Sequence, residues 1–173
     1  SSGDVDGQGL AARFNWPSGL ALDGAGNLFV ADILNFKLRR LAPDGRVTTV
    51  AGTGISAVDG GAAQAIFARP TGLAWDPAGN LFVADGDGGQ VRKIAPDGTV
   101  TTFAGSGRQG DADGQGVAAS FGGLGELAID AARNLWVLDG QALRKIAPDG
   151  TVSTPELATG SEAPAFFGSP SAI

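Results

Sequence analysis

Two pairs of aspartates followed by glycine are the first feature of this sequence that could bind a ligand. The segments 4–7 and 111–114 read Asp-x-Asp-Gly and place two carboxylates close together. Hard cations such as Ca²⁺ bind several closely spaced oxygens, but an EF-hand loop also needs a third acidic position and a terminal Glu. Neither segment has these, so we expect turns here and no cofactor, with a calcium site as the alternative.

Several residue types that usually carry catalysis are absent. The chain contains no His, Cys, Met or Tyr. This excludes a disulfide framework, a thiolate or imidazole metal site, a cysteine nucleophile and a histidine general base. Carboxylates alone are poor general bases at neutral pH unless their pKa is raised. We therefore expect no catalytic site in these residues and no metal site.

Polar side chains recur at positions that could line a binding mouth. Asp32, Asp85 and Asp139 each follow an apolar strand-like run, and they could face a ligand or cap loop N–H groups. Arg13 and Arg69 stand near a phenylalanine at places that we interpret as equivalent. An arginine there could clamp a carboxylate or sulfate, or form a salt bridge with a loop aspartate.

The loop at residues 32–36 is apolar, since it carries Ile33, Leu34 and Phe36. Exposed apolar side chains on a loop suggest a hot spot for a partner, and the alternative is that Phe36 folds back onto the neighbouring repeat. These loops supply the candidate binding residues: Arg13, Asp32, Asn35, Phe36, Arg69, Asp85, Asp87 and Arg108.

The charge balance argues against a nucleic acid partner. Twelve basic and eighteen acidic residues give a net charge of −6, whereas nucleic acid binding depends on Lys and Arg that neutralise phosphates. The basic residues come in sets at repeating positions, which predicts one structural role used three times: 39–40, 92–93 and 144–145.

The sequence predicts no membrane segment, because no apolar run approaches the ~18 residues that a spanning helix needs. The first residues show no signal peptide. The chain does not begin with Met, so we expect a processed product or part of a longer chain. A removed signal would favour an extracellular or periplasmic location, and the residues themselves do not assign a compartment.

An internal repeat positions all of these residues. The segment 17–32 recurs as 70–85 and, with more changes, as 124–139, and its Asn moves from 27 to 80 to 134. Pro-Asp-Gly follows each time and leads into a Val-Thr-Thr or Val-Ser-Thr sequence. A fixed period of this length is the signature of a repeat architecture.

Each repeat predicts four short strands separated by Gly, Pro and Asn turns. In the first repeat we expect strands at about 19–23, 28–31, 37–41 and 47–50. The second strand is apolar on both faces, so the sheet must be covered on both sides. Radial repetition of such sheets gives an all-β propeller, whereas solenoid repeats of about 20–30 residues are shorter.

The repeat resembles the NHL repeat of bacterial type. The resemblance rests on Gly-Leu-Ala-x-Asp-x-x-Gly-Asn-Leu-Phe-Val-Ala-Asp and the following Pro-Asp-Gly, and it weakens in the third repeat, where Glu126 and Arg133 replace glycines. It implies a propeller, usually with six blades, that serves as a non-catalytic binding or scaffold module for a protein or glycan partner. The alternatives are part of a lyase- or hydrolase-type propeller enzyme and a purely structural, self-assembling propeller.

Three blades do not close a ring, because closed propellers have four to eight. Two interpretations are open: these blades are part of a longer propeller, or two copies form a six-bladed ring. The final strand would compete with the partner's residues 19–23, which favours the first interpretation, and open blade faces predict self-association. The longest connections, 51–67 and 104–121, place binding on the face where they lie. The expected blades are 14–52, 67–105 and 121–157, with a linker and the first strand of a further blade at 158–173.

Overall fold

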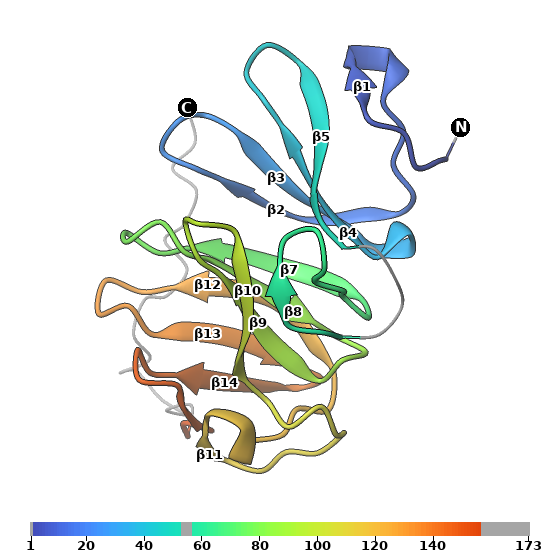
Figure 1. Cartoon of the computed structure of the whole chain (residues 1–173). Helices are drawn as coiled ribbons and strands as arrows, with labels where there is room; N and C mark the ends of the chain where they lie inside the picture. The colour runs from blue at the N-terminus through green and yellow to red at the C-terminus, as the bar shows by residue number, and fades with distance from the viewer. Residues whose placement is uncertain (1, 53–56, 157–173) are drawn as a thin grey trace, which may run out of the picture.

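The computed structural model describes residues 2–52 and 57–156 of the chain. Within these residues it contains three five-stranded antiparallel sheets and three short 3-10 turns. The predicted all-β class is confirmed. The sheets follow one another in chain order and pack face to face, as Figure 1 shows from blue through green to orange.

Each sheet is one blade, and its four main strands run from the inner to the outer edge in chain order. The inner strands of neighbouring blades lie side by side. Blade 1 consists of β2 (Pro17–Leu22), β3 (Leu28–Asp32), β4 (Lys37–Leu41) and β5 (Arg46–Ala51). Blade 2 consists of β7 (Pro70–Trp75), β8 (Leu81–Asp85), β9 (Gln90–Ile94) and β10 (Thr99–Ala104). Blade 3 consists of β12 (Leu124–Ile129), β13 (Leu135–Asp139), β14 (Ala142–Ile146) and β15 (Thr151–Ser153).

Each blade has a fifth strand on its outer edge, which the prediction of four strands per repeat did not include. The segment that precedes each inner strand contributes two residues, which pair with the last strand of the same blade. Gly7 thus lies opposite Val47. The additional strands and turns are β1 (Gly7–Gln8), β6 (Gly60–Gly61), β11 (Gly114–Gln115), η1 (Gly9–Ala11), η2 (Ile33–Asn35) and η3 (Gly116–Ala118). The predicted strand within 158–173 lies outside the described residues.

The turn between the first two strands of each blade is held by an aspartate. In blade 1, Asp23 Oδ1 accepts hydrogen bonds from the N–H groups of Ala25 and Asn27 at 2.9 and 2.8 Å. Gly26 adopts a φ of +81° there, a conformation that glycine reaches without steric cost. Blade 3 has Arg133 at the equivalent place with a φ of +66°, so its turn keeps its shape without the glycine.

The core lies between the blades. One cluster of buried side chains joins blades 1 and 2, and a second joins blades 2 and 3. Phe67 and Phe121 are fully buried in these two clusters. The recurring phenylalanines at these two places therefore form core between blades, while Phe167, the last of the series, lies outside the described residues.

None of the helices in the described residues is long and apolar enough to cross a membrane.

Candidate functional site

The inner strands approach one another too closely for side chains at two glycines. A Cβ on Gly19 would lie 2.0 Å from the carbonyl oxygen of Thr71, and one on Gly72 would lie 2.5 Å from that of Gly125. Real Cβ atoms essentially never come this close to backbone. Glycine at these positions therefore allows the close approach of the inner strands β2, β7 and β12 to one another.

A threonine hydroxyl joins the inner strands of blades 2 and 3. Thr71 Oγ1 lies 3.2 Å from the carbonyl oxygens of Ala84 and Leu124 and 3.3 Å from that of Gly125. In blade 1, Ser18 Oγ lies 3.4 Å from the carbonyl oxygen of Thr71. The pairing register of each inner strand with its neighbour shifts at this point, so these residues form a bulge near the start of the inner strand. We call this end of the three inner strands the mouth.

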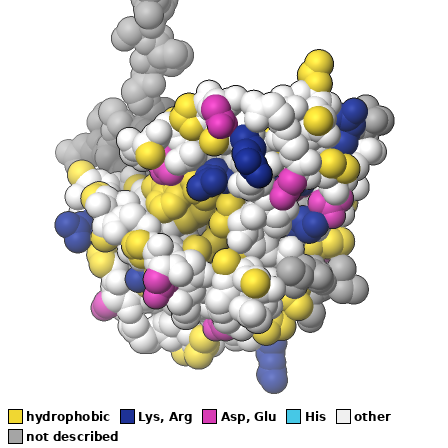
Figure 2. Space-filling model, turned by 45° about the horizontal axis from the view of Figure 1, so that its top comes forward, with side chains coloured by type: hydrophobic (Ala, Val, Ile, Leu, Met, Phe, Trp, Pro, Cys, Tyr) yellow, Lys and Arg dark blue, Asp and Glu magenta, His cyan; other side chains and the backbone are white. Residues whose placement is uncertain are grey.

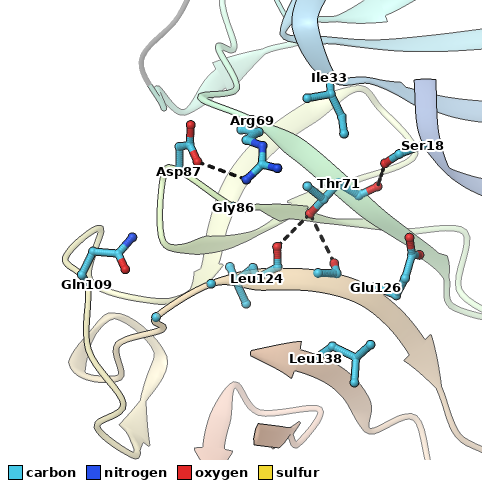
Figure 3. A pocket seen from close by; sticks show the side chains of 13 residues that line it. Ser18, Ile33, Arg69, Thr71, Gly86, Asp87, Gln109, Leu124, Glu126 and Leu138 are labelled. Carbon is cyan, nitrogen blue, oxygen red and sulfur yellow. Dashed lines mark hydrogen bonds and ion pairs between the residues drawn. The ribbon is translucent and has the colours of Figure 1, made fainter. Parts of the chain in front are cut away.

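A pocket of about 520 Å³ opens at this mouth. Figure 3 shows Arg69 and Asp87 on one side of it and Glu126 on the other. The guanidinium of Arg69 lies 3.5 Å from Asp87 Oδ1, and about half or more of each side chain is exposed. Glu126 is exposed as well. The complete lining is Ser18, Ile33, Arg69, Thr71, Gly86, Asp87, Gln109, Gly122, Gly123, Leu124, Gly125, Glu126 and Leu138.

Four of the lining residues are glycines, so much of the pocket wall is backbone. Some of this backbone is already held in place: the N–H of Gly86 donates to the carbonyl of Arg69 at 2.8 Å. The equivalent N–H of Gly140 donates to Gly123 at 3.0 Å. The pocket therefore combines a fixed polar wall with a few charged side chains at its rim.

Arg69 and Asp87 are the two predicted site residues that line this pocket. Arg108 is exposed beside Gln109 but is not part of the lining. Asn35 Nδ2 donates to the carbonyl of Gly3 at 2.9 Å, so it anchors the chain's first residues.

Phe36 is half-buried. It ends the turn η2 with a φ of +55°. Ile33 of the same loop is buried and Leu34 is half exposed, so Leu34 is the apolar tip of this loop.

The recurring aspartates after the second strands are buried and hold loop backbone. Asp85 accepts hydrogen bonds from the N–H groups of Ala68 and Arg69 at 3.0 and 2.6 Å. Asp32 is fully buried too and accepts from the N–H of Asn15 at 2.7 Å. The sequence allowed these aspartates either to face a ligand or to cap loop N–H groups, and in the structure Asp32 and Asp85 cap loop N–H groups. Neither carboxylate reaches the surface of the described residues.

Behind these aspartates, each blade buries an arginine from its third strand. The two terminal nitrogens of Arg39 lie 2.8 Å from Asp32 Oδ2 and 2.7 Å from Asp6 Oδ1. They also donate to the carbonyl oxygens of Val5 at 2.9 Å and Arg13 at 3.2 Å. The side chain is fully buried, and its charge is balanced by the two aspartates.

The same arrangement recurs in the other two blades. We call this buried arginine with its two aspartate partners the arginine latch. Arg92 lies 2.5 Å from Asp59 and 3.6 Å from Asp85. Arg144 lies 2.8 Å from Asp113 and 3.0 Å from Asp139. Each guanidinium also lies over an aromatic ring, at 5.1, 5.7 and 5.2 Å from the ring centres, which adds a cation–π contact. The rings are Phe14, Phe67 and Phe121.

The latch explains the Asp-x-Asp-Gly segments. The carboxylate of Asp6 accepts from the N–H and the hydroxyl of Thr49 at 2.9 and 3.1 Å, in addition to Arg39. Asp59 and Asp113 do the same in their blades. Burial alone would raise the pKa of these three carboxyl groups. The hydrogen bonds from threonine and arginine outweigh it and hold each pKa below its ordinary value.

Blade 2 balances its latch differently. The Arg92 guanidinium is 3.6 Å from Asp85, the longest of the three equivalent distances. Burial raises the pKa of Asp85 above its ordinary value, although two backbone N–H groups and Arg92 act in the opposite direction. In the described residues, no group of three or more acidic side chains is arranged to hold a metal ion.

The predicted equivalence of Arg13 and Arg69 is wrong. The carbonyl of Arg13 accepts from Arg39 just as that of Ile66 accepts from Arg92, so Arg13 corresponds to Ile66. Arg69 corresponds instead to Trp16 and Gly123, because each follows a recurring phenylalanine by two residues. The difference arose because one arginine precedes its phenylalanine and the other follows it.

Trp16, which the sequence interpretation did not consider, is not among the residues that line the pocket. It is 71% exposed and has a φ of +57°, a conformation that is unusual for a bulky side chain. Its counterparts Arg69 and Gly123 both line the pocket. The polar lining residues that the sequence interpretation missed are Ser18, Thr71, Gln109 and Glu126. The sequence did contain a sign that Glu126 has a role of its own, because it replaces a glycine of the repeat.

Comparisons with known proteins support the repeat assignment. No protein-family model matches the chain. NHL repeat-containing protein 2 of Bos taurus is 37% identical over 97 residues, which is 53% of this chain and 13% of that protein. Protein SUPPRESSOR OF QUENCHING 1 of Arabidopsis thaliana is 37% identical over 94 residues, 53% of this chain and 9% of that protein. The chain thus spans about a tenth of the length of these relatives.

Solved structures share the fold. A protein of unknown function from Bacteroides thetaiotaomicron is 28% identical with a TM-score of 0.62, covering 74% of this chain and 33% of that chain. An auxiliary nutrient binding protein from Bacteroides ovatus is 22% identical with a TM-score of 0.64, covering 79% and 37%. A gluconolactonase from Xanthomonas campestris is 14% identical with a TM-score of 0.63, covering 82% and 47%.

The structural neighbours therefore include binding proteins as well as lactonase and lyase enzymes. The neighbours that are under 25% identical establish the fold and not the activity. The repeat matches NHL repeat-containing protein 2 in three species, and the blades match the propellers. Together these similarities support an NHL-like propeller family for this chain.

Proposed function

We propose that this chain is a binding module that takes a hydroxyl-rich ligand, a saccharide or the end of a glycan chain, in the pocket at the mouth of the inner strands. The observation that carries the proposal is the arrangement of Arg69, Asp87 and Glu126 around a glycine-rich wall in a pocket of about 520 Å³. Pockets of this size on a rigid scaffold are the usual position of small-ligand sites.

The chemistry of the rim suits hydroxyl groups. The carboxylates of Asp87 and Glu126 can each accept several hydrogen bonds, and the guanidinium of Arg69 supplies several donors. Gln109 offers both a donor and an acceptor. Because the rim mixes both signs of charge, it favours a neutral polyhydroxylated ligand over a strongly charged one.

Trp16 would add an apolar surface to this site. Its ring is mostly exposed, at the place in blade 1 where the other blades have pocket-lining residues. A rigid, amphipathic aromatic ring provides contact area at little cost in conformational entropy. We assign it the role of a platform on which the apolar face of a sugar ring lies.

We assign binding alone to this pocket. Its acids, Asp87 and Glu126, lie in a chain without His or Cys, and the described lining contains no pairing of a nucleophile with a base. The auxiliary nutrient binding protein from Bacteroides ovatus shares the fold at 22% identity, which is compatible with this role and does not establish it. The lactonase and lyase neighbours share the fold at 14% identity, which does not favour either activity here.

A glycan array followed by calorimetry tests the proposal. We expect Arg69→Ala and Glu126→Gln each to weaken the binding of the selected saccharide about tenfold or more, since a hydrogen bond to a charged group contributes about 1.5–3 kcal/mol. Trp16→Ala should weaken it as well.

The matched controls are Arg46→Ala and Asp111→Asn, which remove exposed charges outside the pocket and should leave the affinity unchanged. The proposal is overturned if no saccharide binds, or if the control variants lose affinity as much as the pocket variants. A protein ligand that binds without Arg69 or Glu126 would also contradict it.

A further inference from the structure

Every blade has two apolar faces of different composition. The leading face packs on the preceding blade, and the trailing face packs on the following one, as the two core clusters show. In the described blades the leading faces consist of Leu20, Leu22, Leu28, Val30, Leu41 and Val47; Leu73, Trp75, Leu81, Val83, Ile94 and Val100; and Leu127, Ile129, Leu135, Val137, Ile146 and Val152.

The leading face of blade 1 is exposed along its inner strand β2, where its counterparts are covered, whereas Val30 and Val47 farther out on the face are buried. Leu20 is 57% exposed, whereas Leu73 and Leu127 at the same position are 4% and 9% exposed. Leu22 beside it is 65% exposed. The face is apolar in all three blades, although single residues differ, as at Leu22, Trp75 and Ile129. The difference in exposure at β2 therefore follows from the absence of a neighbouring trailing face in the described residues.

The trailing face of blade 3 shows the complementary situation. Leu138 is 50% exposed, whereas Ala31 and Ala84 at the same position are completely buried against the next blade. Figure 2 brings the upper end of the view in Figure 1 forward, and it shows hydrophobic side chains gathered on this side of the molecule near basic and acidic ones. Large exposed apolar areas on a protein mark interaction surfaces.

We propose that the leading face of blade 1 docks on the trailing face of blade 3 in a second copy of this chain. Two leading faces are covered in the structure, one at the blade 1–2 interface and one at the blade 2–3 interface. In both, the trailing face of the preceding blade covers the leading face of the next. A second copy carries that face. The docking would continue the interface that already joins the blades.

The contact is heterologous, because two different surfaces meet, and such a contact forms a ring if its rotation closes. Two copies supply six blades, which lies within the four to eight blades of closed propellers, whereas one copy supplies three. Each copy would then use both faces. The docking requires that β2 of the second copy, and not the strand predicted within 158–173, lies next to blade 3. Leu138 of the trailing face also lines the ligand pocket, whereas Leu22 of the leading face does not, so Leu22→Glu tests the docking apart from ligand binding.

Sedimentation velocity on the full chain tests this docking. We expect one species with twice the mass of a single chain. Leu22→Glu on the leading face and Leu138→Lys on the trailing face should each raise the dissociation constant of the two-copy species at least tenfold. Both positions are exposed in the single chain, so the circular dichroism spectrum should not change.

Mixing the two variants gives the sharper result. A Leu22→Glu copy retains a native trailing face, and a Leu138→Lys copy retains a native leading face, so the mixture should associate although neither variant does alone. Val117→Glu is the matched control. Val117 is 63% exposed although blade 2 covers blade 3 there, and this variant should behave like the unmodified chain.

Three outcomes would overturn the proposal. One is a single-chain mass at every concentration, and another is open-ended growth of the assembly with concentration, which a closed ring does not allow. The last is a two-copy species that tolerates both Leu22→Glu and Leu138→Lys.

Discussion

At the scale of residues, the arginine latch accounts for most of the buried charge. Arg39, Arg92 and Arg144 are fully buried, although burying an ion costs several kcal/mol unless it is paired and hydrogen-bonded. Each terminal guanidinium nitrogen has a carboxylate or carbonyl partner. The Nε atoms of the three arginines are buried without a hydrogen bond in the described residues, so the latch is held through its terminal nitrogens.

Removing one arginine should destabilise the fold strongly. We expect Arg144→Met to lower the free energy of unfolding by about 3–5 kcal/mol, because it leaves Asp139 and Asp113 without their shared cation. Urea unfolding measures this change. Arg40→Met on an exposed strand position should change stability by about 0.5 kcal/mol or less.

A double variant tests the mechanism of that loss. In Arg144→Met with Asp139→Asn, the buried carboxylate is replaced by a neutral amide, so the loss should be smaller than for Arg144→Met alone. Equal losses in the single and double variants would show that packing, and not the unpaired charge, is responsible.

Asp130 should make stability depend on pH in acid. Hydrogen bonds from the side chains of Asn134 and Trp136 lower the pKa of Asp130 from 3.8 to about 2. A carboxyl group whose pKa is lowered by folding stabilises the native state above its unfolded pKa, and the contribution is lost as pH falls toward the folded pKa. The interval is therefore between about 4 and about 2.

The measurement is the free energy of unfolding across that interval. Asp130→Asn should lower stability at neutral pH and flatten the fall between pH 4 and 2. Parallel pH profiles for the variant and the unmodified chain would contradict the assignment.

At the scale of elements, the repeat made most of the strands predictable. The strands expected at 28–31 and 37–41 are observed as β3 and β4 within one residue, because apolar runs between Gly-Asn and Pro-Asp-Gly turns leave little choice. The two-residue strands such as Gly7–Gln8 were not predictable, since glycine has low strand propensity. They form because Asp6 and Asp59 are held by the arginine latch.

The candidate site was less predictable than the strands, for a physical reason. Aspartates such as Asp85 and arginines such as Arg92 are exposed in most proteins, and here the fold buries them against each other. The pocket instead depends on departures from the repeat, such as Glu126, and on glycines whose role is set by the approach of two strands far apart in sequence.

The inner strands should not accept a side chain at their closest approach. We expect Gly72→Ala to destabilise the protein by about 1–3 kcal/mol or more, because its Cβ would lie 2.5 Å from a carbonyl oxygen of the neighbouring strand. Gly24→Ala is the control. A Cβ at Gly24 would have no atom within 4 Å in the described residues, so thermal denaturation should show little change. Equal shifts in Tm for the two variants would contradict this account of the spacing.

At the scale of the whole molecule, the blades are joined by continuous cores. The cluster between blades 1 and 2 and that between blades 2 and 3 both include residues of blade 2. In repeat proteins, stability is approximately a sum of the repeats and the interfaces between neighbours. Strong interfaces therefore couple the blades into one unfolding unit.

The chain contains three tryptophans, one in each blade region, and they can report this coupling. In each variant that retains only Trp16, Trp75 or Trp136, with phenylalanine at the other two positions, the urea midpoint by fluorescence should equal the midpoint by circular dichroism of the same variant. Trp75 packs edge-on against Phe29 at 4.9 Å, and phenylalanine can preserve an aromatic contact there. A fluorescence midpoint that differs from the circular dichroism midpoint of the same variant would show that the blades unfold independently.

The outer strand of each blade also determines when that blade can form during synthesis. The aspartate beside it binds a threonine 41 to 43 residues later in the chain. On a ribosome, the first segment of a blade therefore emerges long before its partner, and it stays unpaired until the last strand has been made. Since proteins fold from the N-terminus during synthesis, we expect the nascent chain to gain structure in steps of one whole blade.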